Sequence, residues 1–348
     1  MFSLLNWIVG SLSGIVCKKK YIPLLVTVCM SLLFIMNENN RDLTAYKLLY
    51  AEASMGFVSG LEPGYNLLCY LFSHIGFDYM TFRNVMAVGS IALLAFSAKR
   101  LSTRPALALS LYCFAQFWLD ITLSRNFFSL ALVVWATSWY FTRRGGDVRF
   151  VVLILAAASI HESSIVYLVF PIAKRVGYNS VLTASVVSSL VVLMLMVSTI
   201  ANNVLVSLLD PEEYSHYFMS RPFLGSILCS VTSLLFIVTA QLLNNDNKID
   251  NEKKALVKNI ACANLLALPL CILYFLNSSE LFRLFKCILF LDYSVMSLYI
   301  NELGVDSENK QIAICILAIG IALVFFTLAS SHPLDGSLVP ILFESTAL

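Results

Sequence analysis

The sequence predicts an all-α, polytopic integral membrane bundle of about 10–12 transmembrane helices, with one or two short broken or re-entrant helices. Of the 348 residues, 59% are hydrophobic and only 13% are charged, whereas soluble domains carry about 25% charge. Apolar runs close to the roughly 20 residues that cross a bilayer recur along the chain. No polar stretch is long enough to fold alone, so we expect one membrane-embedded domain over residues 1–348.

The apolar runs define the elements in order. We expect spanning helices over residues 2–16, 21–36, 81–98, 105–123, 126–142, 178–200, 222–243, 256–276, 282–300 and 311–330. Two further runs are too short for a simple crossing: residues 64–76, and the pair 150–160 and 163–173. At about 1.5 Å per residue, each arm of the pair reaches only about 17 Å.

Basic residues predict the orientation, because cytoplasmic loops are enriched in Lys and Arg. The basic positions fall between the apolar runs, at Lys18–Lys20, Lys99, Arg100, Arg104, Arg143, Arg144, Arg149, Lys174, Arg175 and within 248–258. The polar loops 37–63 and 201–222 then lie on the opposite side, which we expect to be the periplasm or the cell exterior.

Residues 150–173 form an apolar run that is interrupted by His161 and Glu162. Ionisable side chains at membrane depth are costly and are kept mainly where they line a cavity or do chemistry. Because Arg149 and Lys174 should share a side, we expect a broken hairpin with His161 at its tip. The alternative is a single span that holds the cluster at mid-membrane.

Several classes of protein and site are disfavoured. The sequence contains no basic stretch large enough to bind the phosphates of a nucleic acid. The nine cysteines lie in or beside apolar runs without a CxxC motif, and His161 has no second histidine at ligand spacing. We therefore expect no nucleic-acid partner, no metal site and no cofactor.

The first outer loop offers acids and a phenol. Asp42 and Tyr46 are four residues apart, so on a helix they would share a face. Glu62 precedes Pro63, which suits the first turn of a short helix. The alternative is an ordinary solvated loop.

Arg125 stands between two apolar runs, where its guanidinium could hold a phosphate through two parallel hydrogen bonds. An interfacial arginine, or one paired with Asp120, is the alternative. His161 could act as a general base, with Glu162 as its orienting acid. Alternatively, Ser163 and its neighbours only cap and pack a helix start.

Two later segments carry further candidates. Tyr214 and Tyr217 lie in an acidic, aromatic loop, a composition common where sugars bind, although a plain solvated loop has the same composition. Arg283 and Lys286 share a helical stripe with Phe290 and Tyr293. Two cations on one face could bind a lipid diphosphate, or Lys286 could pair with Asp292 or another acid inside the bundle.

These residues, taken together, resemble the EpsG-type and Wzy-type polysaccharide polymerases of bacterial inner membranes. The resemblance rests on four segments in the family's order, spread over roughly residues 20–300: Asp42-x3-Tyr46, Glu62–Leu68, Ser124-Arg125-Asn126 and Ala157–Ser164. The chain departs from the family at Asn126, where the family often has Gln, and at Glu162, where it often has Lys.

The resemblance implies an O-antigen or polysaccharide polymerase that joins undecaprenyl-diphosphate-linked oligosaccharide units at the periplasmic face. On this hypothesis the catalytic residues are Arg125 and Arg283, which hold the diphosphate, His161, which takes the acceptor proton, and Asp42, which positions the acceptor sugar with Tyr46. The predicted substrate-binding residues are Tyr46, Glu62, Glu162, Tyr214, Tyr217 and Lys286. Membrane lipids, a chain-length regulator and a flippase are the further partners that the resemblance implies.

Other functions compete with this one. A flippase or transporter of the same lipid-linked sugar would place ionisable residues at the midplane and use both faces of the membrane. A membrane acyltransferase acting on surface glycans would also use a histidine at membrane depth. The gathering of candidate residues toward one face favours the polymerase.

Overall fold

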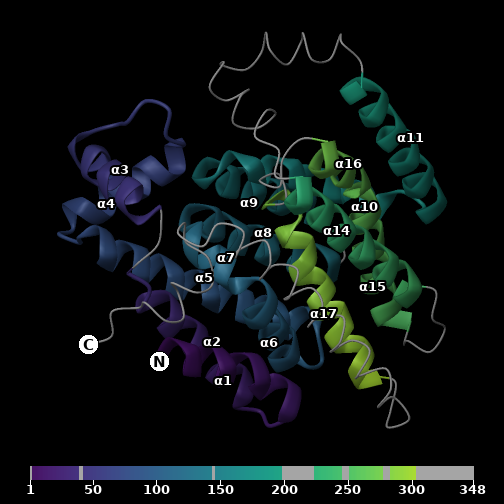
Figure 1. Cartoon of the computed structure of the whole chain (residues 1–348), viewed down its shortest axis with the longest axis horizontal. Coiled ribbons are helices and arrows are strands. Elements are labelled where there is room, and N and C mark those ends of the chain that lie inside the picture. Colours follow the sequence, from purple (N-terminus) through teal and green to yellow (C-terminus); the bar gives the residue numbers. More distant parts are fainter. Residues whose placement is uncertain are drawn as a thin grey trace. The chain divides into compact units, whose positions relative to one another are not determined.

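The chain is an all-α helical membrane bundle, and no strand occurs among the residues that the structure describes (Figure 1). The structure is a computed structural model, and it describes residues 2–38, 42–142, 146–197, 223–244, 251–276 and 283–302. The helices are α1 (Phe2–Val16), α2 (Ile22–Ile35), α3 (Leu43–Met55), α4 (Pro63–His74), α5 (Tyr79–Leu101), α6 (Pro105–Ala115), α7 (Phe117–Thr122), α8 (Ser124–Thr142), α9 (Asp147–Ile160), the 3₁₀ helix η1 (Glu162–Val169), α10 (Phe170–Arg175), α11 (Tyr178–Val197), α14 (Phe223–Asn244), α15 (Asn251–Leu266), α16 (Leu268–Leu276) and α17 (Lys286–Glu302).

Most of the predicted spans are confirmed as helices. Helices α1, α2, α5, α8, α11, α14 and α17 match the expected ranges to within a few residues. Among the described residues, 79–101 and 253–273 are long and apolar enough to cross a membrane, and several shorter apolar helices accompany them. The span expected over residues 311–330 and the loop over 201–222 lie outside the described residues.

The prediction of one unbroken span over residues 105–123 is wrong. The chain bends at Gln116, between α6 and α7, where the backbone has φ −126° and ψ −31°. The buried Asp120 carboxylate accepts hydrogen bonds from the Tyr112 hydroxyl at 2.7 Å and the Gln116 amide at 3.1 Å. A buried carboxylate needs such partners, and these bonds join the two short helices across the bend.

The expected span over 256–276 also contains a bend. Helix α15 ends at Leu266 and α16 begins at Leu268. Pro269 has no N–H to donate to the carbonyl four residues earlier, so the regular hydrogen-bond ladder cannot continue through it. Hydrogen bonds between residues three positions apart replace the ladder there. The Ala267 amide donates to the Asn264 carbonyl, and the Leu270 amide donates to the Ala267 carbonyl.

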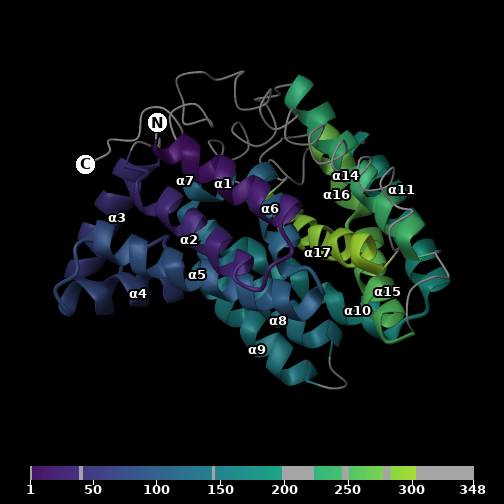
Figure 2. The same ribbon diagram turned by 90° about the horizontal axis from the view of Figure 1, so that it is seen from below.

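The chain divides into two compact units, residues 1–168 with 293–348, and residues 169–292. In the first unit, α5 packs against α8, α2 and α6, while α1 packs against α2 and α6. Figure 2 shows α1 and α2, in purple, side by side. Helix α9 packs against α8 and α4, which places the end of α9 beside the start of α4.

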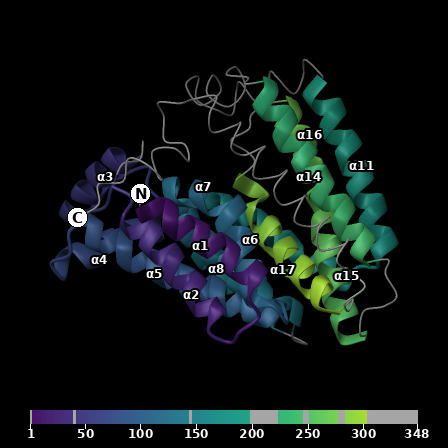
Figure 3. The ribbon, with the colours of Figure 1, turned by 60° about the horizontal axis from the view of Figure 1, so that its bottom comes forward.

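In the second unit, α11, α14, α15 and α16 pack on one another (Figure 3). Helix α10 packs against α15. The Asn264 amide donates to the Asp292 carboxylate at 2.7 Å, joining α15 to α17. Asn264 is thus the partner of one Asp292 oxygen, while the pairing of Lys286 with an acid stays a prediction.

An aromatic core fills the first unit where α3, α4, α5 and α8 meet. The buried ring of Phe82 contacts Tyr50, Tyr65, Phe72 and Phe128 at centroid distances of 5.2 to 6.5 Å. Aromatic pairs in such edge-to-face and stacked geometries add to the free energy of burial. This core fixes the ends of four helices on which the candidate site is built.

Candidate functional site

Glu62 occupies the position just before α4, in extended backbone with φ −60° and ψ 138°. As predicted, Pro63 begins the helix, where its fixed φ suits the first turn. Gly64 follows, and a Cβ at this position would lie 2.2 Å from the Ser159 Oγ of α9. Only glycine lets α4 approach α9 this closely, and the approach brings Glu62 to the end of α9.

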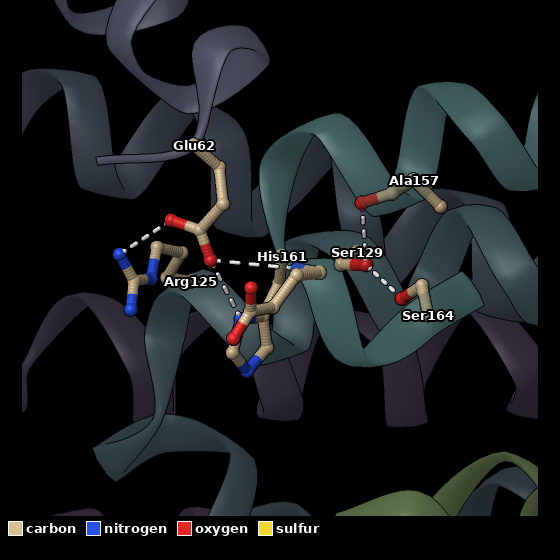
Figure 4. A network of polar contacts seen from close by, with 7 residues as sticks. Glu62, Arg125, Ser129, Ala157, His161 and Ser164 are labelled. Carbon is tan, nitrogen blue, oxygen red and sulfur yellow. Dashed lines mark hydrogen bonds and ion pairs between the residues drawn. The ribbon is translucent and has the colours of Figure 1, made fainter. Parts of the chain in front are cut away.

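The Glu62 carboxylate links two residues from distant parts of the sequence (Figure 4). The Arg125 Nη1 atom of α8 lies 2.7 Å from one carboxylate oxygen, and the His161 Nδ1 atom lies 3.0 Å from the other. The Glu162 backbone amide also donates to this second oxygen, at 3.4 Å. The predicted candidates Arg125, His161 and Glu62 therefore form one cluster.

The environment of Glu62 keeps its carboxylate charged. Burial alone would raise the pKa of Glu62, but the hydrogen bond with His161 and the charge of Arg125 outweigh burial and lower this pKa. The side chain of Glu62 is only 13% exposed, whereas that of Arg125 is 24% exposed. Arg125 is thus the part of the cluster that is most open to an incoming anion.

The helical path is interrupted at His161. Helix α9 ends there, with His161 in extended backbone at φ −151° and ψ 115°. The Ser129 hydroxyl of α8 contacts both the Ala157 carbonyl and the Ser164 hydroxyl (Figure 4). A continuous helix would hold the Cα atoms of these two residues about 10 Å apart, so the shared contact with Ser129 fits a break in the helix between them. The predicted break at His161 is confirmed.

Tyr46 and Asp42 adjoin the same cluster. Burial raises the pKa of Tyr46 to about 12, while the charge of Arg125 acts in the opposite direction and Asp42 and Glu62 raise it further. Helix α3 begins directly after Asp42, so the predicted helical spacing of these two residues is confirmed. The Arg125 guanidinium also lies 5.8 Å from the centre of the Tyr65 ring, within the range of a cation–π contact.

This geometry separates two chemical roles. A neutral imidazole that donates its Nδ1–H to this carboxylate presents Nε2 as a proton acceptor. Arg125 uses Nη1 for Glu62, and the other N–H groups of its guanidinium have no hydrogen-bond partner among the described residues. Arg125 does not pair with Asp120, which corrects that alternative. The described residues include no group of three or more His, Cys, Asp or Glu that could hold a metal ion.

Not every predicted site residue joins this cluster. The Glu162 side chain is exposed, and only its backbone amide reaches Glu62. Arg283 and Lys286 belong to the second unit. Helix α17 begins at Lys286, so Arg283 lies in the short 3₁₀ turn before it and not on the helical stripe that was predicted. Tyr214 and Tyr217 lie outside the described residues.

The sequence interpretation missed several supporting residues. Ser129 stands four residues after Arg125, so the two share a face of α8, a spacing that could have signalled its role. Arg83 on α5 is only 1% exposed and lies 4.4 Å from the centre of the Phe34 ring. Its place inside an apolar run gave no indication of the partner ring.

The comparisons with known proteins give one match. A family model described as the EpsG family matches residues 21–341, which is nearly the whole chain. Neither the curated proteins nor the solved structures contain a match.

Proposed function

The chain belongs to the EpsG family, and from this premise we propose that it is a polysaccharide polymerase of the bacterial inner membrane. Its substrates would be oligosaccharide repeat units carried on undecaprenyl diphosphate. The observation that carries the proposal is the Glu62 carboxylate, which holds Arg125 on one oxygen and His161 on the other. An anion-binding group and a proton acceptor are thereby fixed side by side.

The reaction transfers the growing chain from its lipid diphosphate to a sugar hydroxyl of a new lipid-linked unit. A glycosidic bond forms between the acceptor oxygen and the anomeric carbon, while the bond from that carbon to the diphosphate oxygen breaks. The hydroxyl proton passes to His161 Nε2, and undecaprenyl diphosphate leaves with its negative charge. Bond cleavage at the diphosphate drives the step, so no nucleotide is required.

Each residue of the cluster has a role in this proposal. Arg125 holds the leaving diphosphate through the N–H groups that Glu62 does not use, since a guanidinium fork matches phosphate oxygens. Glu62 fixes the His161 ring and stabilises the imidazolium that forms. Tyr46 remains a neutral phenol, so it positions the acceptor sugar by hydrogen bonding beside Asp42.

The remaining predicted residues complete the proposal. Arg283 and Lys286 would contribute to binding the lipid diphosphate, and Tyr214, Tyr217 and Glu162 to binding sugars. The cluster would face the periplasm, where a flippase delivers the units and a chain-length regulator ends growth.

A reconstituted assay tests the function. Purified protein with lipid-linked repeat units should produce a ladder of longer products on a gel. His161→Ala and Arg125→Ala should each lower the rate by about 10²–10⁴-fold, the usual contribution of a general base or an electrostatic stabiliser. The exposed residues His74 and Arg149 provide matched controls, and His74→Ala and Arg149→Ala should leave the rate unchanged.

The same assay separates the alternatives. A flippase would translocate the units without lengthening them, and an acyltransferase would transfer radiolabelled acyl groups to the glycan instead. If either result appears, or if His161→Ala polymerises at the normal rate, the proposal is wrong.

A further inference from the structure

The first unit contains a cavity that is remote from Glu62 and has a volume of about 650 Å³. It lies between the α1–α2 loop, the start of α2, the last turns of α5 and the start of α6. Its volume is within the range of about 300–1,000 Å³ that is typical of ligand sites. The residues around it fall into two chemically distinct groups.

One group is cationic. The cavity is lined by five basic residues, and no acidic residue lines it. The basic residues are Lys18, Lys19, Lys20, Lys99 and Arg104. Within the described part of the chain, none of the four lysines has an acidic partner. Arg104 is fixed in place, because its Nη2 donates to the carbonyls of Gly14 at 3.1 Å and Ile15 at 3.3 Å.

The other group is apolar. This apolar wall of the cavity comes from α2 and α5 and consists of Pro23, Leu24, Ala92, Ala95 and Phe96. Leu24 is 66% exposed and Phe96 is 63% exposed, which is ordinary for side chains that face lipid tails but costly in water. A ligand that suits both groups carries a negative head and a hydrocarbon chain.

The cavity lies at the opposite end of α5 from the candidate site. The N-terminal end of α5 adjoins α3, where the Tyr79 and Tyr50 rings contact each other at 5.8 Å. Lys99 at the other end lines the cavity, and twenty residues of helix separate Tyr79 from Lys99 by about 30 Å. This is about the thickness of a bilayer's hydrocarbon core, so the two sites fall in opposite leaflets.

We propose that this cavity binds an acidic glycerophospholipid of the cytoplasmic leaflet. The phosphate of the lipid would lie among Lys18, Lys19, Lys20 and Lys99, and an acyl chain would follow the wall formed by Ala95 and its apolar neighbours. Basic pockets between membrane helices on the cytoplasmic side bind anionic headgroups in this way. The proposal does not depend on the polymerase activity, and its test does not measure that activity.

The experiment measures lipid retention by native mass spectrometry of the full chain, released from nanodiscs that contain equal amounts of phosphatidylglycerol and phosphatidylcholine. Phosphatidylglycerol should remain bound in preference. The variant K18Q/K19Q/K20Q should weaken its binding by about fivefold per lysine, or on the order of a hundredfold together. The variant K253Q/K254Q/K258Q removes the same charge elsewhere and should retain the lipid.

A second pair of variants keeps the charge constant. Ala95→Trp fills the apolar part of the cavity and should release the lipid, whereas Val88→Trp, on the same helix but outside the cavity, should not. The proposal is overturned if the two lysine variants lose lipid equally, or if Ala95→Trp retains it. It is also overturned if phosphatidylcholine is held as well, or if inorganic phosphate or undecaprenyl phosphate binds there in place of the phospholipid.

Discussion

At the scale of single residues, Glu62 determines the geometry of the site because its two oxygens serve different partners. Its pKa is lowered in the folded state from the ordinary value of 4.5. The stabilisation that it contributes is therefore complete above pH 4.5 and is lost as the pH falls through the lowered folded-state pKa. Glu62 should remain charged throughout the neutral range.

This predicts a pH-dependent difference between the wild-type chain and Glu62→Gln. The variant should be less stable by about 1–3 kcal/mol near pH 7, because charge-assisted hydrogen bonds are lost. The difference should shrink only below pH 4.5, which thermal unfolding of the detergent-purified proteins at several pH values would measure. Glu52→Gln, at an exposed position of α3, removes the same charge and should show no such difference. A stability gap that closed already at pH 6 would contradict this account.

Tyr46 leads to a second prediction at this scale. With a pKa of about 12, its phenol stays protonated and can donate a hydrogen bond but cannot act as a base. Tyr46→Phe should raise the KM for the acceptor up to about tenfold, the value of one hydrogen bond. The pH dependence of kcat should remain as in the wild type between pH 6 and 9. Tyr70→Phe, on α4, provides the matched control, and a shifted pH profile for Tyr46→Phe would disprove the positioning role.

At the scale of elements, the contact between α4 and α9 depends on the missing side chain at Gly64. Gly64→Ala should destabilise the protein by about 1–3 kcal/mol, because a methyl group there overlaps Ser159 and overpacks the contact. Gly89→Ala provides the control, since a Cβ at Gly89 meets nothing within 4 Å and alanine favours the helix. Thermal unfolding and polymer length together would show whether Gly64→Ala also displaces Glu62.

The sequence predicts most helices correctly because apolar runs of spanning length leave few alternatives in a chain with so little charge. The break at His161 was also predictable, since costly polar residues interrupt an apolar run there. The bend at Pro269 carried a local signal that the interpretation overlooked. The bend at Gln116 carried none, because it depends on hydrogen bonds from Gln116 and Tyr112 to Asp120, and only the folded bundle shows that Asp120 is buried.

The residues of the candidate site were predictable from the sequence, but the contacts between them were not. Arg125, His161 and Glu62 were all candidates, yet the nearest acid to Arg125 in the sequence is Asp120, and the acid next to His161 is Glu162. The residue that contacts both is Glu62, which lies 63 positions from Arg125 and 99 from His161. Such long-range pairing follows from the packing of α4 on α9, which spacing along the chain cannot reveal.

At the scale of the whole molecule, the orientation in the membrane is a testable prediction. Phe57→Cys, in the exposed loop between α3 and α4, should react with a membrane-impermeant maleimide added from the periplasmic side. Thr103→Cys, in the loop after α5, should react only after the cells are opened. Both cysteine variants are made in a chain that also carries Cys17→Ser, which removes the one partly exposed cysteine among the described residues. The other described cysteines are buried. The reverse labelling pattern would invert the proposed topology and place the candidate site in the cytoplasm.

The 23 residues of α5 have one further consequence. A helix of this length extends about 35 Å, which exceeds the roughly 30 Å hydrocarbon thickness of a typical bilayer. Its ends therefore extend beyond the hydrocarbon core, and an apolar stretch that exceeds the local thickness is accommodated by tilting, by kinking or by thickening of the bilayer. Because the Tyr79 end of α5 adjoins α3 beside the Glu62 cluster, we expect the acyl-chain length of the surrounding lipids to affect how α5 holds this site.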